Sequence, residues 1–189
     1  MNRRTSIILG IVALASILAL PASASTFVAM DEQELVAASA TVVEGRVLEV
    51  HSFWNADGTA ILTEATVRVT DVVAGRAADV VTVRTFGGRV GDHVIEAHGF
   101  PTFQQGERAL LFLQGGADGT LRVTGYQLGH YRVRSDERGR KLAVPTMEAG
   151  VQLLRKDGTP APRPQAVELD GFKDVVRSFA ARTPNAIVK

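Results

Sequence analysis

The chain of 189 residues contains no cysteine. It therefore cannot form a disulfide, a zinc–thiolate site, a thiol redox pair or a thiol nucleophile. A lipid-anchored lipoprotein is excluded as well, because there is no cysteine at the cleavage site of the N-terminal segment described below. Stability must come from a packed core, and a chain of this length is long enough for one domain to form one.

The sequence also lacks the usual signatures of catalysis. No serine stands in a Gly-x-Ser-x-Gly pattern, which marks the nucleophile of many hydrolases. The pattern Gly87-Gly88-x-x-Gly91 fits neither the dinucleotide fingerprint nor the nucleotide-triphosphate loop, so we expect no cofactor. We interpret these glycines as positive-φ positions at a strand end. No catalytic residue stands out, and we favour a protein that is not an enzyme. A carboxylate pair that meets only in the folded chain leaves no sequence pattern, so an enzyme remains the alternative.

The first residues have the pattern of an export signal. Arg3 and Arg4 precede an uncharged apolar run from Ile7 to Leu20, and Ala22-Ser23-Ala24 has the small-x-small form of a cleavage site. The apolar run is shorter than the about 20 residues that a transmembrane helix needs. We predict a signal peptide over 1–24, cleavage after Ala24, and a secreted or periplasmic protein without a stable membrane anchor.

The charge of the chain argues against a nucleic-acid partner. The formal net charge of +1 becomes −1 after cleavage, because two arginines and no acids are removed. Proteins that bind nucleic acid through their backbone phosphates need a basic face. We therefore predict no nucleic-acid partner.

Strand patterns dominate the middle of the chain. Apolar and polar residues alternate from Ile61 to Val73, which is typical of a half-buried strand. Gly45 inside the preceding strand pattern indicates a bulge or a sharp coil. The loop of residues 51–60 contains an Asp57-Gly58 turn. The predicted strands cover residues 41–50, 61–73, 80–86, 107–114, 121–134 (one or two strands, interrupted by glycines) and 141–145.

One helix is predicted on each side of these strands. Asp31 and Glu34 form a capping-box pattern at the start of a short helix over 30–40. Leu169, Phe172, Val176 and Phe179 recur at helical spacing over 169–182, after a proline-rich linker at 159–165. The sequence predicts a mainly β fold, a small antiparallel OB-like β-barrel with a short N-terminal helix and a C-terminal amphipathic helix. We expect the barrel domain over 25–150 and the linker with its helix over 151–189.

Acids and histidines gather between the third and fourth main strands. Asp92, His93, Glu96 and His98 are metal-ligand types, and they would be the site of a metal-dependent hydrolase. However, His93 and His98 are five residues apart, whereas the zincin motif places two histidines at i and i+4. We interpret the four residues as solvated side chains on a long loop, predict no metal, and keep His93 and His98 as weak metal candidates.

Three aromatic residues are candidates for contacts with a partner. Phe100 and Phe103 flank Pro101, which sets a turn. They form either an apolar plug at one barrel end or an exposed aromatic contact. Trp54 lies in the predicted loop after the first strand, where it would either fold over the barrel end or stack on a sugar or a protein surface. A glycan- or envelope-binding module is therefore a further alternative.

The blocks "ASATVVEGRVLEV", "VTVRTFGGRVG" and "GFPTFQQGERALLFL" carry a resemblance to known proteins. With the Trp-bearing turn between them, they resemble a family of exported bacterial proteins, largely uncharacterised, over residues 27–133. The Gly-Gly-x-x-Gly and Gly-x-Pro-x-Phe-x-x-Gly-Glu blocks are its most recognisable features. This resemblance implies export and carries no activity with it.

The order of a short polar N-terminus, a helix, a Val-rich strand and a long second strand is also similar to the OB-fold domain of tissue inhibitors of metalloproteinases and to netrin-like modules. That likeness implies that Ser25 and Thr26 would stand where the inhibitors chelate the protease zinc. The inhibitors begin with a disulfide-bonded cysteine, which this chain lacks. We therefore expect a non-enzymatic binding or accessory protein acting on another exported protein, with a metalloprotease as one form of that partner, and with Ser25, Thr26, Trp54, Phe100 and Phe103 as its partner-binding residues.

Overall fold

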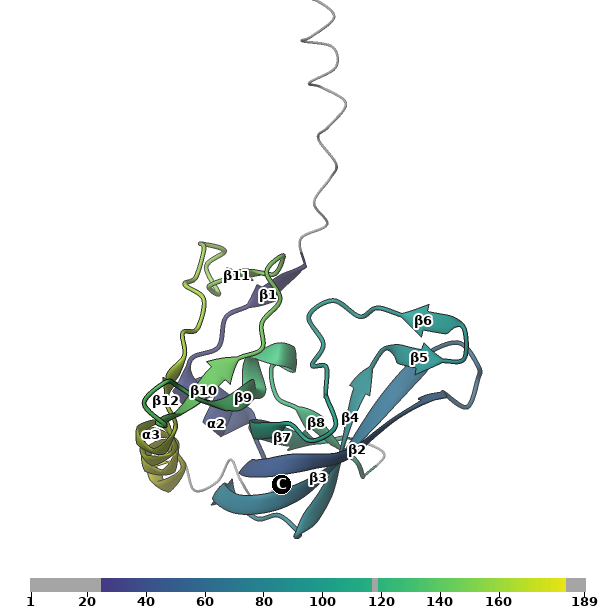
Figure 1. Cartoon of the computed structure of the whole chain (residues 1–189). Helices are drawn as coiled ribbons and strands as arrows, with labels where there is room; N and C mark the ends of the chain where they lie inside the picture. Colours follow the sequence, from purple (N-terminus) through teal and green to yellow (C-terminus); the bar gives the residue numbers. More distant parts are fainter. Residues whose placement is uncertain (1–24, 117–118, 183–189) are drawn as a thin grey trace, which may run out of the picture.

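The computed structural model describes residues 25–116 and 119–182. The predicted signal peptide, with its cleavage position after Ala24, lies outside the described residues. Within those residues, no helix combines the length and apolar character needed to cross a membrane. Figure 1 shows the arrangement of the strands and helices.

The prediction of a mainly β fold with a barrel is confirmed, because the described residues form a closed five-stranded β-barrel accompanied by two α-helices. The elements are β1 (Thr26–Val28), α2 (Glu32–Ala38), β2 (Thr41–Trp54), β3 (Ile61–Gly75), β4 (Val80–Phe86), β5 (Gly88–Val90), β6 (His93–Ile95), β7 (Arg108–Gly115), β8 (Leu121–Val123), the 3-10 helix η2 (Tyr126–Gly129), β9 (His130–Ser135), β10 (Lys141–Pro145), β11 (Gln152–Leu154), β12 (Val167–Glu168) and α3 (Leu169–Arg182).

The barrel closes through five neighbouring strand pairs. β2 pairs with β3, β3 with β4, β4 with β8, β8 with β7, and β7 returns to β2. The pair of β4 with β8, at Val83 and Leu121, is parallel, whereas the sequence analysis predicted antiparallel strands throughout. The reason is that β8 is the hairpin partner of β7 and runs antiparallel to it. Where β8 pairs with β4, the two strands therefore run in the same direction.

A bulged first strand lets the barrel curve. The pairing of β2 with β3 shifts register at three places, and one of them lies between Glu44 and Gly45. The bulge predicted at Gly45 is therefore confirmed. A Cβ atom on Gly45 would lie 2.7 Å from the carbonyl oxygen of Arg68 and 2.6 Å from Cγ1 of Val67. Only glycine allows this close approach of two backbones.

The first hairpin extends further than the sequence predicted. His51 to Trp54, expected in a loop, continue β2 and pair with residues 61–64 of β3. The side-chain oxygen of Asn55 accepts hydrogen bonds from the backbone N–H groups of Thr59 and Ala60, and this closes a short turn. Because the turn is short, pairing continues to its edge, and Trp54 lies at the end of a strand.

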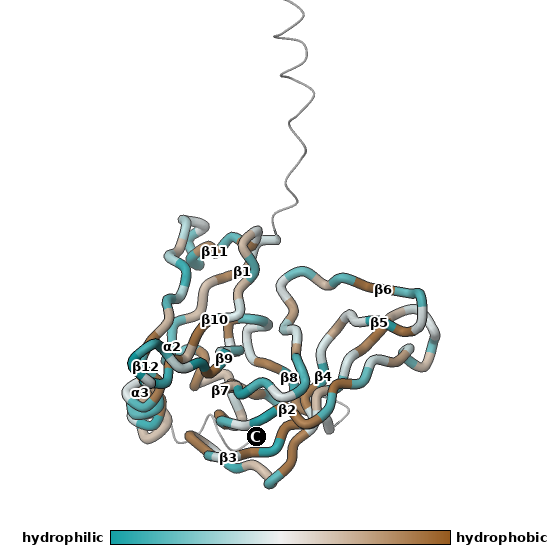
Figure 2. The backbone as a smooth tube through the Cα atoms, in the orientation of Figure 1, coloured by the Kyte–Doolittle hydropathy of each residue, from teal (hydrophilic) through white to brown (hydrophobic). Residues whose placement is uncertain are grey.

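Two cores lie on opposite sides of the barrel wall. The first fills the barrel and includes Val43, Val67, Phe103 and Leu111. The second lies outside it and includes Leu35 of α2, Phe112 of β7 and Phe172 of α3. Since successive residues of a strand point to opposite faces, Leu111 and Phe112 enter different cores. Figure 2 shows the resulting succession of brown apolar and teal polar positions along the long strands.

The C-terminal part of the chain joins the second core. β9, β10 and β12 extend the sheet from the edge of β7 that does not pair with β2, and β11 pairs in parallel with β1. Val151, Leu153, Leu169 and Val176 are buried in the same core as α2. In the predicted proline-rich linker, the guanidinium of Arg163 donates to the carbonyls of residues 147, 148, 149 and 151. Residues 151–182 therefore pack as part of one structure with the barrel.

A buried ionic cluster attaches α3 to the barrel. The side chain of Glu44 on β2 is 1% exposed, and its Oε2 accepts a hydrogen bond of 2.6 Å from Nζ of Lys173 on α3. Lys173 also lies 2.7 Å from Asp71 of β3, which in turn pairs with Arg177. Arg108 of β7 pairs with the other oxygen of Glu44. The cluster thus joins three barrel strands and one helix.

Candidate binding site: two adjoining pockets

Two pockets meet at the end of the barrel where β4 leads into the segment 87–107. The first, here called the aromatic pocket, has a volume of about 400 Å³ and is lined by Arg84, Phe86, Phe100, Arg122 and Tyr126, among others. The second, here called the hairpin pocket, has a volume of about 450 Å³ and lies against the β5–β6 hairpin. Both are lined by Thr85, Phe86 and Pro101, so they adjoin along these three residues.

A row of aromatic rings runs along the aromatic pocket. The ring centroids of Phe86 and Phe100 are 5.7 Å apart, and those of Phe100 and Tyr126 are 5.0 Å apart in an edge-on arrangement. Phe27 of β1 continues the row at 5.4 Å from Tyr126. These distances lie within the range of favourable aromatic pairs. Phe86 and Tyr126 are 39% and 47% exposed, so part of the row remains available to solvent.

Tyr126 holds an unusual backbone conformation. Its φ of 58° is the only positive value at a non-glycine position among the described residues. A left-handed conformation costs about 1–2 kcal/mol for a residue with a side chain. It is held by flanking hydrogen bonds, from the N–H of Gln127 to the carbonyl of Gly99 and from the N–H of Leu128 to the carbonyl of Gly125. Strained residues of this kind cluster at functional sites, and here the strain places a tyrosine ring at the pocket.

The sequence analysis did not identify Tyr126, Phe86 or Arg122. It treated residues 121–134 as strands interrupted by glycines, whereas the interruption is the 3-10 helix η2. The one available signal was Gly125, whose left-handed φ of 63° starts this turn. Nothing in a single sequence shows that the residue after such a glycine is also left-handed.

The hairpin pocket contains hydroxyl groups that are already paired. Oγ of Ser52 and Oγ1 of Thr63 are 2.8 Å apart, and Thr63 also donates to the carbonyl of Gly87. Gly88 packs on them so closely that a Cβ atom would lie 2.3 Å from Oγ1 of Thr63. In the part of the chain that is described, these hydroxyls thus bond to each other and to the main chain. Neither hydroxyl is hydrogen-bonded to a histidine or a carboxylate of the described residues.

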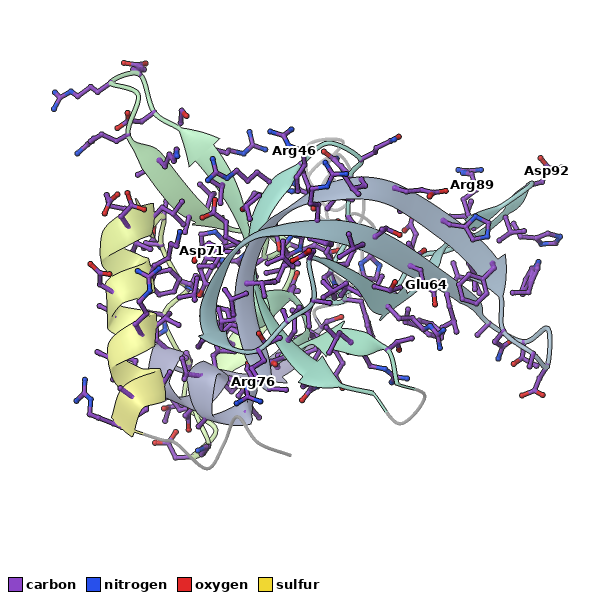
Figure 3. All side chains as sticks on the ribbon, turned by 90° about the horizontal axis from the view of Figure 1, so that it is seen from below. Arg46, Glu64, Asp71, Arg76, Arg89 and Asp92 are labelled. Atoms are coloured by element: carbon purple, nitrogen blue, oxygen red, sulfur yellow. The ribbon has the colours of Figure 1, made fainter. Side chains whose placement is uncertain are left out.

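The four metal candidates do not converge. The ring of His93 lies 5.5 Å edge-on from Trp54, and Nδ1 of His98 is 3.2 Å from Oε2 of Glu148. Asp92 and Glu96 are exposed, and Figure 3 shows Asp92 at the outer end of the molecule. Among residues 25–116 and 119–182, no group of three or more acids and histidines is placed to hold a metal ion.

The aromatic candidates occupy different environments. Phe103 is 8% exposed within the barrel core, and its ring stacks on that of the buried His130 at 4.9 Å. Phe100 is half-buried in the aromatic row, and Trp54 is 37% exposed beside the hairpin. Little of Phe103 is therefore available to a partner, whereas Phe100 and Trp54 present part of their rings.

A buried acid supports the ring of His130. Oε1 of Glu107 lies 3.3 Å from Nε2 of His130, and its Oε2 accepts from Nε of Arg132 at 2.9 Å. Burial raises the pKa of Glu107, but the hydrogen bond and charge of His130, together with Arg132, outweigh it, so that the pKa lies below its usual value. The carboxylate of Glu107 is thus kept charged. It holds the rings of His130 and Phe103 in place through its contact with His130, at the end of the segment 87–107 that lines both pockets.

The N-terminal candidates lie in the small β1–β11 sheet. The carbonyl of Ser25 accepts a hydrogen bond of 2.9 Å from the N–H of Gln152, and Thr26 pairs with Gln152 in the parallel register. Thr26 is exposed. The main-chain oxygen that a zinc-chelating N-terminus would use therefore accepts one hydrogen bond in this structure.

The sequence was compared with models of known protein families and with curated proteins. No family model matches it, and no curated protein is significantly similar to it.

Proposed function

We propose that this chain is an exported, non-enzymatic binding protein that holds a segment of another exported protein in the aromatic pocket. The observation that supports it most is the row of Phe86, Phe100 and Tyr126, which includes a strained and half-exposed tyrosine. Tyrosine, phenylalanine and arginine are enriched in the cores of protein–protein interfaces. A pocket that combines them is suited to an apolar side chain of a partner.

The charges around the pocket suit the same kind of partner. Arg84 and Arg122 line it, and none of the described residues that line it is an acid. Arg84 is also placed over the ring of Phe53, at 5.7 Å from the centroid. Because Nε and Nη2 of Arg84 already donate to Oε1 of Glu64, this lining suits an extended segment with an aromatic or aliphatic side chain and without a positive charge beside it.

The barrel topology supports an OB-like interpretation. In chain order, the five barrel strands are β2, β3, β4, β7 and β8. The first of them, β2, pairs with both the second, β3, and the fourth, β7, which is a Greek-key order. OB barrels bind their ligands on the face of the second and third strands. Here these are β3 and β4, and they contribute Leu62, Arg84 and Phe86 to the aromatic pocket. The site proposed from the aromatic row therefore coincides with the binding face of that fold.

The protease-inhibitor form of this proposal would place Ser25 and Thr26 at the zinc of a metalloprotease. The hydrogen bond from the N–H of Gln152 to the carbonyl of Ser25 holds this end of the chain against β11, so zinc would have to use the remaining lone pair of that oxygen or displace the hydrogen bond. Ordering a released N-terminus on the protease would carry a further entropic cost. We therefore place the main contact in the aromatic pocket, and a metalloprotease remains one class of partner.

The test is a capture experiment with a matched pair of variants. A chain that begins at Ser25 and carries a tag after Lys189 is incubated with the exported proteins of the producing organism. Tyr126→Asn is expected to lower retention of the partner at least about ten-fold, because aromatic hot spots contribute about 2 kcal/mol or more. The free energy of unfolding of this variant is expected to change by less than about 1 kcal/mol. Asparagine tolerates the left-handed conformation better than tyrosine, and this relief of strain offsets the loss of the ring contacts.

Val80→Ala is the control, because Val80 is exposed to nearly the same extent as Tyr126, 46% against 47%, and does not line either pocket. It is expected to retain the partner as the unchanged chain does. Equal retention by the unchanged chain and by Tyr126→Asn would refute the proposal.

A further inference from the structure

A third cavity lies across β2, β7, β9 and β10, shares no lining residue with the aromatic pocket, and is strongly cationic. It has a volume of about 370 Å³, and its basic lining residues come from four adjacent strands: Arg46 of β2, Arg108 of β7, Arg132 and Arg134 of β9, and Lys141 of β10. Among the described residues that line it, Glu107 is the one acid. The whole chain has almost as many acids as bases, 20 against 21, so this concentration of one sign is local.

The pairing of strands brings these residues together. Arg46 of β2 stands directly opposite Arg108 of β7 and, on its other side, opposite Arg68 of β3. Like charges directly across a sheet are destabilising. If these charges served only to keep the protein soluble, an acid at one of these positions would make the fold more stable.

The charges are only partly neutralised by the protein itself. Arg108 pairs with Glu44, and Arg132 pairs with Glu107. Arg46 donates to the carbonyl of Gly106, at 3.0 Å, and this holds its guanidinium in place without neutralising it. Within the described residues, Arg46, Arg134 and Lys141 form no salt bridge. Three positive charges around one cavity therefore remain without an acidic partner.

We propose that this cavity binds a small soluble ligand that carries two or more phosphate groups. The planar fork of arginine matches the oxygens of a phosphate, and lysine supplies a point charge beside it. Arg46 and Arg132 are already oriented by backbone carbonyls, those of Gly106 and Thr102, so little freedom is lost when a ligand binds. A single phosphate would leave much of this charge unmatched, and this favours a ligand with at least two.

The size of the cavity favours a small ligand over a long polyanion. Its volume lies near the lower end of the range for small-molecule pockets. A nucleic acid would need a basic stripe that continues across the molecule. Here Asp136, directly after β9, is paired with Arg140, so an acid interrupts the positive charge on this side of the cavity.

The experiment measures the binding of pyrophosphate by calorimetry at low ionic strength. The double variant Arg134→Ala, Lys141→Ala removes two exposed cations without a salt-bridge partner, so the fold is expected to persist, and thermal unfolding checks this. Binding is expected to weaken at least about ten-fold, since two cationic hydrogen-bond donors to the phosphates are lost. Inorganic phosphate is expected to bind more weakly than pyrophosphate.

The matched control is Arg76→Ala, Arg89→Ala, which removes the same net charge elsewhere. Figure 3 shows both residues well away from Arg46. The control is expected to bind pyrophosphate as the unchanged chain does. Absence of binding, equal weakening in both double variants, or tighter binding of a single-stranded oligonucleotide than of pyrophosphate would overturn the proposal.

Discussion

Replacing Lys173 with methionine is expected to lower the free energy of unfolding by about 3 kcal/mol. Lys173 Nζ is the hydrogen-bond donor to Oε2 of Glu44, whose side chain is 1% exposed. Methionine fills a similar volume but leaves this buried oxygen without a partner. The remaining pair of Glu44 with Arg108 keeps the cost at the lower end of the range known for broken buried ion pairs. Urea unfolding of both proteins gives the difference directly.

The pH dependence of this difference identifies its origin. Burial lowers the pKa of Lys173, but its hydrogen bonds with Asp71 and Glu44 outweigh this and raise the pKa above its usual value of 10.5. A raised pKa in the folded state stabilises the fold below pH 10.5, and this contribution is lost as the pH rises through the folded pKa. The cost of Lys173→Met is therefore expected to be full at pH 7 and smaller above pH 10.5.

A second variant separates charge from packing. In the double variant Glu44→Met, Lys173→Met both buried charges of the pair are replaced by apolar side chains, and most of the stability is expected to return. A single variant as stable as the unchanged chain, or a cost that does not depend on pH, would show that the ion pair does not attach α3 to the barrel.

Replacing Phe103 with alanine is expected to lower the free energy of unfolding by about 3–5 kcal/mol. Phe103 is 8% exposed in the barrel core and stacks on His130, so its removal leaves a cavity next to a buried polar ring. This tests the two sequence interpretations of Phe103, because an apolar plug predicts a large loss of stability and a partner contact predicts a small one. Thermal or denaturant unfolding measures it.

Phe100→Ala provides the contrast three residues away. Phe100 is half-buried in the aromatic row, so its replacement is expected to cost less stability than that of Phe103 and to lower retention of the partner. If Phe103→Ala unfolded no more readily than Phe100→Ala, the assignment of Phe103 to the core would be contradicted.

The sequence predicted those elements that depend on local pattern. The alternation at 61–73 identified β3, the helical spacing of Leu169, Phe172 and Val176 matched α3, and the capping box of Asp31 and Glu34 is present. Gly45 was interpreted as a bulge, and the register shift lies there. These features follow from interactions between residues that are close in the chain, so a single sequence can show them.

Features that depend on distant partners were not visible. Glu44 and Lys173 are 129 residues apart, and no local pattern in the sequence connects them. The pairing of β1 with β11 and the parallel pair of β4 with β8 join segments whose patterns do not identify each other. Of the site, Phe100 was named in advance, whereas Phe86 and Tyr126 were not, because their approach depends on closure of the barrel and on a left-handed turn. The cationic cavity likewise exists only once four strands are aligned.

The most direct test of the proposed function is photo-crosslinking from the aromatic pocket. Tyr126 is replaced by a photoreactive phenylalanine analogue, and in a separate protein the same analogue replaces the equally exposed Val80. Each protein is irradiated with the exported proteins of the producing organism, and adducts are identified by mass spectrometry. Binding in the aromatic pocket predicts one dominant adduct from position 126, mapping to one segment of the partner, and none from position 80. An adduct from position 80 alone, or none from either position, would contradict it.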